Sequence, residues 1–282
     1  MKIAFATCVE LGKSCIEEIY RLEGKLDLMI TLKDEKAKNK SGRIYLDDLS
    51  CQHNVPLLKI DNINDQETLQ ELKNKEIDWL FIIGWSQIAK KNLLNAPSKG
   101  CIGMHPTLLP EGRGRAAVPW AILKGLDKTG VTAFKIDEGV DTGPIIDQVE
   151  IPLNTHETAT LLYEKVSDAH IVLMKQLWNS IQNEELTFEP QDNSRATYWE
   201  GRKPQDGEIL AEMTMKEAGA LIRAVTKPYP GSFYQKDGAK LRIWEAKFSN
   251  EKPVVETYIT LKDGYLIPTK FNFEEEEVLE NA

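Results

Sequence analysis

The sequence lacks most of the features that mark secreted, membrane and nucleic-acid-binding proteins. It has four cysteines in 282 residues and no C-x-x-C pair, which disfavours a zinc site or a disulfide framework. No apolar stretch reaches about 18 residues, and no charged-then-apolar leader stands at its start. The net charge is −9 and no strong basic patch is evident, which argues against binding to nucleic-acid phosphates. We therefore expect a cytoplasmic protein with no metal site, no membrane partner and no nucleic-acid partner.

Short apolar runs are present in the first half of the chain, separated by polar segments of helical length. The runs lie at residues 2–7, 26–32, 55–60, 78–84 and 99–105. Such runs are typical of strands buried on both faces of a parallel sheet. Residues 12–24 and 65–76 carry apolar side chains at helical spacing. The alternation predicts an α/β fold with a Rossmann-like open, mostly parallel sheet, and the absence of G-x-G-x-x-G excludes the usual dinucleotide fingerprint.

The chain is long enough for two domains. An amphipathic segment over residues 156–184 is predicted to close the first domain as a helix, and a polar stretch with two prolines and two glycines follows it. Beyond it, the pattern predicts a helix near 214–225 and strands around 233–248 and 254–268. The predicted organisation is a catalytic domain over 1–187, a smaller C-terminal α+β or β domain over 188–275, and an acidic tail over 276–282.

One apolar run ends on a histidine, His105, and a basic, proline-containing loop follows it. In an open α/β sheet, ligands bind outside the carboxyl ends of the strands. Residues 129–137 are predicted as another strand, and the glycine-containing turn after it carries Asp141. A lone buried His is more often a satisfied core residue, and Asp beside Gly is ordinary turn chemistry. Both groups together at one edge of the sheet, however, predict an active site.

Four segments of the sequence resemble a known family. The segments GMHPTLLPEGRGRAAVPWAILKG and KTGVTAFKIDEGVDTGPIIDQVEIPL resemble the catalytic core of the formyltransferases that use 10-formyltetrahydrofolate. The segments ATYWEGRKPQDGEI and LIRAVTKPYPGSF are similar to the start of the smaller C-terminal domain of the tRNA and sugar members. The resemblance implies a catalytic set of Asn, His and Asp. His105 and Asp141 match that set, whereas the Asn position falls on Gly103.

The resemblance also implies binding residues and a chemistry. Formyl transfer needs a stabilised oxyanion and a route for the amine's proton, which His105 and Asp141 can supply together. The main chain at Gln87, Ile88, Ala89 and Val140 is expected to face the pteridine of the co-substrate 10-formyltetrahydrofolate. Gly84 is expected to allow close approach of the ligand, and Trp85 either to stack on it or to pack in the core. The candidates for substrate binding are Thr107, Arg113 and Arg115, the two arginines as phosphate ligands or as ordinary surface residues.

Three functions are compatible with these residues. The leading hypothesis is a formyltransferase acting on the amino group of a nucleotide-linked amino dideoxy sugar of the 4-amino-4,6-dideoxy kind. The second is a methionyl-tRNA formyltransferase, which would need a basic tRNA surface and a longer C-terminal domain. The third is a non-catalytic folate-binding or nucleotide-binding module, because Gly103 supplies no side-chain donor. The small-molecule nucleotide sugar is the expected partner, and a homodimer is left open.

Overall fold

The computed structural model describes residues 1–36, 38, 42–236 and 239–275. The amino-terminal elements are β1 (Ile3–Ala6), α1 (Glu10–Arg21), β2 (Leu28–Leu32), α2 (Asp47–His53), β3 (Leu57–Ile60), α3 (Gln66–Asn74), β4 (Trp79–Ile83), α4 (Lys91–Leu94) and β5 (Gly100–His105). Then come β6 (Arg113–Gly114), α5 (Ala117–Leu123), β7 (Lys128–Lys135), β8 (Ile145–Pro152), α6 (Ala159–Gln182) and β9 (Tyr198–Trp199). The last elements are α7 (Met215–Val225), β10 (Ser232–Lys236), β11 (Ala239–Ser249), β12 (Ile259–Leu261) and β13 (Gly264–Glu275).

Two compact units are distinguished in the chain, each assembled from separate segments. The first contains residues 1–114, 129–151 and 165–199, and the second contains residues 115–128, 152–164 and the described residues from 200 onward. The predicted domains follow the order of the sequence, whereas these units interleave, and the domain boundary after residue 187 stays a prediction. The predicted acidic tail over 276–282 lies outside the described residues.

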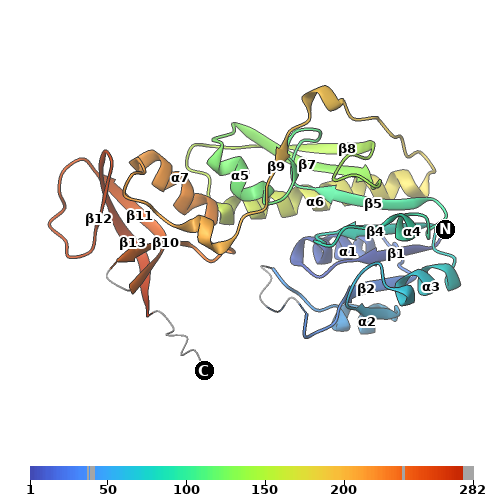
Figure 1. The fold of residues 1–282 in the computed structure, drawn as a ribbon. Coiled ribbons are helices and arrows are strands. Elements are labelled where there is room, and N and C mark those ends of the chain that lie inside the picture. Colours follow the sequence, from blue (N-terminus) through green and yellow to red (C-terminus); the bar gives the residue numbers. More distant parts are fainter. Residues whose placement is uncertain (37, 39–41, 237–238, 276–282) are drawn as a thin grey trace. The chain divides into compact units, whose positions relative to one another are not determined.

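The first unit is built on a sheet of seven described strands in the order β3-β2-β1-β4-β5-β7-β8 (Figure 1). The pairs β1–β2, β1–β4, β2–β3 and β4–β5 are parallel, as the continuous apolar runs predict. The pair β5–β7 is antiparallel. The predicted fold class, an α/β protein with a Rossmann-like, mostly parallel sheet, is therefore confirmed.

Alternate residues of these strands face opposite sides of the sheet. On one side they form a buried cluster with residues of the neighbouring helices and loops: Ala4, Ala6, Leu28, Ile30, Leu80, Ile82 and Cys101 with Ile63, Leu72 and Leu93. Elsewhere in the unit α1 lies beside α6, since Cys15 Sγ is 3.8 Å from the carbonyl oxygen of His170. Burial on both faces explains why the strands read as unbroken apolar runs.

The second unit contains a sheet of four described strands in the order β10-β11-β13-β12, with antiparallel pairing throughout. Helix α7 packs on it through Leu221 and Ile222, which share a buried cluster with Ile243 and Leu266 of the sheet. The helix predicted near 214–225 agrees with α7.

Two of the strand predictions in the second unit were wrong in detail. The segment around 233–248 contains the two paired strands β10 and β11, and the segment around 254–268 contains β12 and the start of β13. The second error has a physical cause: Lys262 and Asp263 form a two-residue turn between β12 and β13, where Leu261 pairs with Gly264. Helices α2 and α4 and strand β8 were not anticipated.

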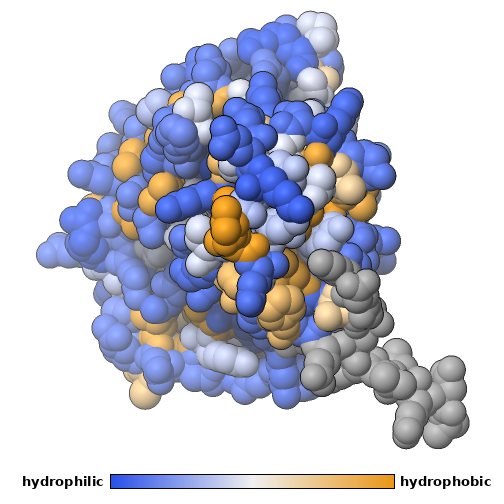
Figure 2. Space-filling model, turned by 90° about the vertical axis from the view of Figure 1, so that its left-hand side faces the viewer, coloured by the Kyte–Doolittle hydropathy of each residue, from blue (hydrophilic) through white to orange (hydrophobic). Residues whose placement is uncertain are grey.

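The surface agrees with the polar composition. A space-filling view of one face is predominantly hydrophilic, as 28% charged residues would produce, with several hydrophobic groups near its centre (Figure 2). Among the described residues, no helix combines the length and the apolar character needed to cross a membrane.

Candidate active site

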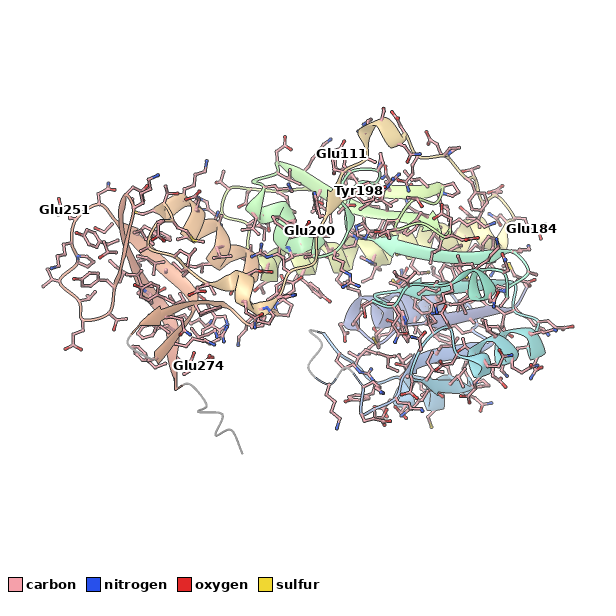
Figure 3. All side chains as sticks on the ribbon, in the orientation of Figure 1. Glu111, Glu184, Tyr198, Glu200, Glu251 and Glu274 are labelled. Atoms are coloured by element: carbon pink, nitrogen blue, oxygen red, sulfur yellow. The ribbon has the colours of Figure 1, made fainter. Side chains whose placement is uncertain are left out.

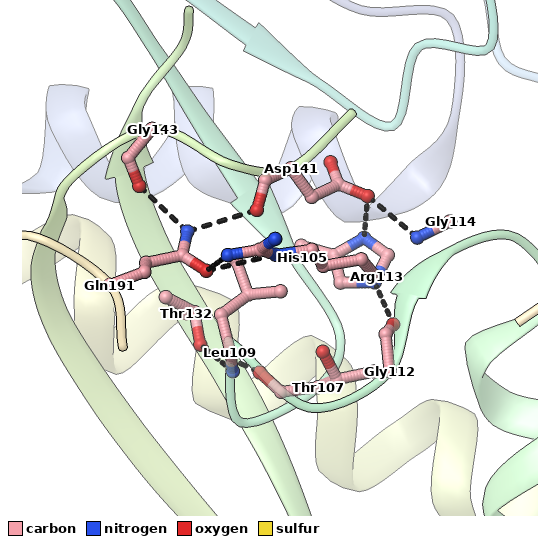
Figure 4. A network of polar contacts seen from close by, with 10 residues as sticks. All are labelled: His105, Thr107, Leu109, Gly112, Arg113, Gly114, Thr132, Asp141, Gly143 and Gln191. Atoms are coloured by element: carbon pink, nitrogen blue, oxygen red, sulfur yellow. Dashed lines mark hydrogen bonds and ion pairs between the residues drawn. The ribbon is translucent and has the colours of Figure 1, made fainter. Parts of the chain in front are cut away.

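His105 ends strand β5, and its ring is held between two acceptors. The residue is 8% exposed, and its Nε2 atom lies 2.8 Å from the carbonyl oxygen of Gly112. On the other side of the ring, Nδ1 lies 3.6 Å from Oδ2 of Asp141 (Figure 4). Both ring nitrogens of His105 therefore face an oxygen atom of the protein, Nε2 at hydrogen-bond distance and Nδ1 beyond it.

Asp141 reaches His105 by a different route from the one predicted. The prediction assumed that the two strands run parallel, so that their carboxyl ends share an edge. The pairing is antiparallel, and Lys135 at the end of β7 lies opposite Ile102, three residues before the histidine. Residues 136–144 must therefore return along the sheet to bring Asp141 to His105. The structure brings the predicted pair together through a loop and not through strand ends.

The carboxylate of Asp141 is anchored on one side only. Its backbone has a φ of 54°, in the left-handed region that Asp tolerates better than most residues. Oδ2 accepts a hydrogen bond of 2.9 Å from the backbone N–H of Gly114 and faces His105. Oδ1 has no partner among the described residues, and the side chain is 20% exposed. One oxygen thus fixes the carboxylate, and the other is open to a proton.

Gly103 faces apolar side chains. An ideal Cβ built on it lies 3.1 Å from Cδ1 and Cγ1 of Ile136 and 3.3 Å from Cε1 of Phe134. Both neighbours come from β7 and the segment that follows it. A side chain at the position where the family resemblance implies an Asn would therefore require its neighbours to shift by a few tenths of an ångström, and Gly103 itself offers no side-chain hydrogen bond.

The loop after His105 is fixed by a small polar network. The carbonyl of Thr107 accepts a hydrogen bond of 2.7 Å from Thr132 Oγ1, and that oxygen in turn accepts from the backbone N–H of Leu109 and from Gln148 Nε2. The Thr107 hydroxyl is buried and has no hydrogen-bond partner among the described residues. Its predicted contact with the substrate stays a prediction.

Arg113 does not have the exposure that a phosphate ligand needs. It is 1% exposed, and its guanidinium donates to Gln191 Oε1 at 3.1 and 2.7 Å, to Asn193 Oδ1 at 2.8 Å and to the Tyr198 hydroxyl at 2.9 Å. Tyr198 lies on β9, near Glu111 (Figure 3). These protein acceptors occupy the guanidinium, so we withdraw the interpretation of Arg113 as a substrate ligand. Arg115, which is exposed in the second unit, remains the candidate of the two.

Three of the predicted folate-site residues contribute to the fold. Gly84 has a φ of +67°, and an added Cβ would lie 2.1 Å from Val9 Cγ2. Its close packing against Val9 requires a glycine here, and the predicted approach of a ligand to Gly84 stays a prediction. Trp85 packs against the main core cluster and donates from Nε1 to Gln87 Oε1 at 3.2 Å. Gln87 also accepts from the backbone N–H of Ile63 and donates to the carbonyl of Asp61, both at 2.9 Å.

The main chain of the same segment, unlike its side chains, has hydrogen-bond donors that the fold does not use. The backbone N–H groups of Gln87, Ile88, Ala89 and Val140 have no hydrogen-bond partner among the described residues. The side chains of Ile88 and Val140 are 65% and 49% exposed. An ion pair of 3.1 Å between Lys91 and Glu138 ties the two segments together. The structure therefore has open backbone donors in neighbouring loops where the pteridine site was predicted.

Sequence reasoning missed several residues of the network in Figure 4. Gln191 follows α6 in a polar, proline-containing stretch whose composition is typical of a linker. Thr132 lies in an apolar strand, and Gln148 lies in β8, which the sequence did not predict. No local pattern distinguishes these residues from surface polar residues, because their partners are distant in the chain.

Comparison with known proteins identifies the family. The Formyl transferase profile matches residues 21–177, and the profile of the Formyl transferase C-terminal domain matches residues 202–272. Methionyl-tRNA formyltransferase of Clostridioides difficile strain 630 is 28% identical over 274 residues, covering 95% of this chain and 88% of the relative. The corresponding protein of Lachnospira eligens is 26% identical over 259 residues, covering 91% of this chain and 82% of the relative.

A solved structure shares the fold over the whole chain. The N-formyltransferase of Helicobacter canadensis, in complex with folinic acid and dTDP-3-aminofucose, has a TM-score of 0.71 and 24% identity, covering 96% of this chain and 100% of that one. The first profile alone spans more than half of the chain and contains both His105 and Asp141. The chain belongs to the formyl transferase family.

Proposed function

We propose that this protein transfers the formyl group of 10-formyltetrahydrofolate to the amino group of a nucleotide-linked amino sugar. One observation carries the catalytic part: His105 and Asp141 lie 3.6 Å apart at the end of β5, in a chain of the formyl transferase family. At this distance the carboxylate and the imidazole can act on the same reacting group.

The two side chains have complementary roles in this reaction. The neutral amine attacks the formyl carbon, a new C–N bond forms, and the bond between that carbon and N10 of the folate breaks. His105 stabilises the negative charge on the formyl oxygen through the N–H group at Nδ1, which lies 3.6 Å from Asp141 Oδ2, beyond hydrogen-bond distance. Asp141 accepts the amine's proton on its open oxygen, Oδ1, directly or through a water molecule. As the bond to N10 breaks, the same proton passes to the departing folate nitrogen, so Asp141 returns to its carboxylate form.

The folate end of the site fits the open backbone donors. The pteridine edge presents hydrogen-bond acceptors and donors, and the N–H groups of Gln87, Ile88, Ala89 and Val140 have no partner among the described residues. The exposed apolar side chains of Ile88 and Val140 offer contact to a planar ring. These four main-chain positions would hold the co-substrate, while the side chains of Trp85 and Gln87 support the loop.

The choice of an amino-sugar acceptor depends on charge and on a structural neighbour. The net charge of −9 disfavours an extended nucleic-acid surface, whereas the exposed guanidinium of Arg115 can bind a compact diphosphate. The similar structure from Helicobacter canadensis was solved with a nucleotide-linked amino sugar. Methionyl-tRNA remains the second candidate, because the curated relatives at 26% and 28% identity carry that activity in their names.

The test is formyl transfer by the purified protein with 10-formyltetrahydrofolate and a panel of acceptors. The panel contains nucleotide-linked 3-amino and 4-amino sugars and methionyl initiator tRNA. We expect turnover with an amino-sugar nucleotide, with the 4-amino kind as the specific expectation. Turnover of the tRNA alone would overturn this choice of acceptor in favour of the second candidate.

The catalytic pair has its own prediction. His105→Ala and Asp141→Asn should each lower kcat by about 100-fold or more, because each removes an electrostatic or proton-transfer role. His156→Ala is the matched control, since His156 is exposed. Folded variants of His105 and Asp141 with nearly full rates would show that the assignment is wrong.

Arg115 has a separate prediction. Arg115→Ala should raise the KM for the nucleotide sugar by more than it lowers kcat, because a phosphate contact contributes to ground and transition states alike. Arg21→Ala, which removes an exposed guanidinium on α1 that is paired with Glu18, should leave both constants unchanged. An unchanged KM in Arg115→Ala would exclude the phosphate contact.

A further inference from the structure

Residues 189–199, which follow α6, pass across the loop after His105 and form hydrogen bonds with it. We call this segment the strap. Strand β9 of the strap pairs with β6, which lies in the loop after His105. Thr197 of the strap accepts hydrogen bonds from the backbone N–H of Gly112 at 2.8 Å and from that of Arg113 at 2.9 Å. The strap therefore holds the loop whose Gly112 carbonyl contacts the His105 ring.

The contact between the strap and the loop contains the buried guanidinium of Arg113, whose hydrogen-bond acceptors are neutral side chains. Arg113 is 1% exposed, and burying a guanidinium is costly unless its donors are satisfied. Gln191 supplies the largest part of that satisfaction, since its Oε1 accepts from both Nε and Nη2 at 3.1 and 2.7 Å. Asn193 and Tyr198 accept the remaining hydrogen bonds. The orientation of the Gln191 amide is thereby fixed, because its oxygen must face Arg113.

The other end of the same amide holds the catalytic carboxylate's backbone. Gln191 Nε2 donates to the carbonyl of Asp141 at 2.9 Å and to the carbonyl of Gly143 at 2.7 Å (Figure 4). Asp141 has a left-handed backbone, a conformation that persists only where the surroundings impose it. With the oxygen of Gln191 committed to Arg113, its two N–H donors are aimed at the turn that contains Asp141.

We infer that Arg113 and Gln191 are positioning residues that set the Asp141 carboxylate against the His105 ring. The inference rests on the proposed roles of these two side chains. The path is continuous: Arg113 stands next to Gly112, the strap bridges to Gln191, and Gln191 binds the Asp141 carbonyl. Asp141 is held again by its Oδ2 contact to Gly114. Segments 110–114, 141–143 and 189–199 thus close one polar ring around the catalytic pair.

A purely structural role for Gln191 makes a different prediction from a positioning role. Structural support alone would lower the melting temperature and leave the geometry of the folded site intact. A positioning residue changes kcat at nearly constant KM, because displacement of a reacting group by about 1 Å can cost about 100-fold in rate. It also changes the environment of the His105 ring in the folded protein, which NMR detects directly.

The experiment compares Gln191→Glu and Gln191→Met with Asn193→Ala. Gln191→Glu keeps an acceptor for Arg113 but loses the N–H donors to Asp141 and Gly143. Gln191→Met has a side chain of similar size and loses both the acceptor and the donors. Asn193→Ala is the matched control, because Asn193 binds the same guanidinium and does not contact the Asp141 turn. The measurements are kcat and KM for both substrates, thermal unfolding, and the His105 ring signals, assigned with His105→Ala.

We expect both Gln191 variants to fold, to lose about 10-fold to 100-fold in kcat at nearly constant KM, and to shift the His105 signals. Asn193→Ala should lower the melting temperature, because it removes one acceptor of the buried Arg113 guanidinium, but should change kcat and the His105 signals much less than either Gln191 variant. A folded Gln191→Glu protein with wild-type kcat and unshifted His105 signals would overturn the inference, as would an equal effect of Asn193→Ala. If His105→Ala and Asp141→Asn are fully active, the proposed function fails instead, and the NMR comparison still decides whether Gln191 positions the pair.

Discussion

Gly103 stands where the resemblance implies a catalytic Asn, and replacing it tests whether the packing of this chain excludes that side chain. An ideal Cβ lies 3.1 Å from two atoms of Ile136 and 3.3 Å from Phe134. Carbon atoms in favourable contact lie about 3.5–4.0 Å apart. Gly103→Asn adds not only this Cβ but also an amide group beyond it. We therefore expect the new side chain to displace Ile136.

The size of the effect follows from these contacts. Overpacking a core costs about 1–3 kcal/mol, which in a protein of this size lowers Tm by several degrees. Gly103→Ala should cost less than Gly103→Asn, since only the end of the Ile136 side chain must move by a few tenths of an ångström. Ile136→Ala removes both of the closest atoms. The double variant Gly103→Asn with Ile136→Ala should therefore be more stable than the sum of the single changes, by about 1 kcal/mol or more.

Urea unfolding of the wild type, the two single variants and the double variant provides this double-mutant cycle, with unchanged m-values as the check that the unfolded state is comparable. The reasoning is refuted if Gly103→Asn is as stable as the wild type. It is also refuted if the two single effects add within about 0.5 kcal/mol, because the contact with Ile136 would then not be the source of the cost.

Two further predictions concern stability. Burial lowers the pKa of His170 to about 4, so between about pH 6.5 and pH 4 only the unfolded chain binds a proton there, and the free energy of unfolding should fall by about 1.4 kcal/mol per pH unit as the pH drops through that window. Urea unfolding at several pH values should show this slope in the wild type and in His156→Gln, and an identical slope in His170→Gln would contradict it. Thr214 is the N-cap residue of α7, and its hydroxyl accepts a hydrogen bond from the backbone N–H of Glu217 at 3.2 Å. Thr214→Ala should therefore lower the free energy of unfolding by about 1 kcal/mol. Thr214→Ser, which keeps the hydroxyl, should lose much less in the same assay, and equal losses would exclude the cap as the cause.

The part of the fold that sequence patterns predict well is the buried parallel sheet. Strands β1, β2, β4 and β5 are apolar on both faces, so each leaves a run of apolar residues that composition alone reveals. The direction of β7 leaves no such trace. Its residues 129–134 are all buried, and an antiparallel strand buried on both faces has the same pattern as a parallel one. The prediction that His105 and Asp141 lie close together was therefore right, although the parallel strands that it assumed are antiparallel in the structure.

The candidate site shows the same division between local and distant information. His105 and Asp141 are recognisable because the chemistry needs these residue types within short motifs. The burial of Arg113 is not recognisable, because an arginine between glycines is typical of an exposed loop and its acceptors lie about 80 residues away. The same holds for Gln191, whose surroundings in the sequence are those of a linker. A sequence pattern of a few residues does not reveal a side chain whose role depends on hydrogen bonds to distant parts of the chain.

The antiparallel β7 explains why this site needs a strap. If both catalytic groups stood at the carboxyl ends of parallel strands, the sheet's own hydrogen bonds would fix their separation. Here only His105 lies on a strand, and Asp141 lies in the returning segment 136–144, whose position the sheet does not determine. A loop that contains a residue with a left-handed backbone, as Asp141 has, must be held by contacts outside the sheet. The buried Arg113 and the Gln191 amide supply such contacts, so we expect the His105–Asp141 distance to depend on the stretch after α6 as much as on the strand that ends at His105.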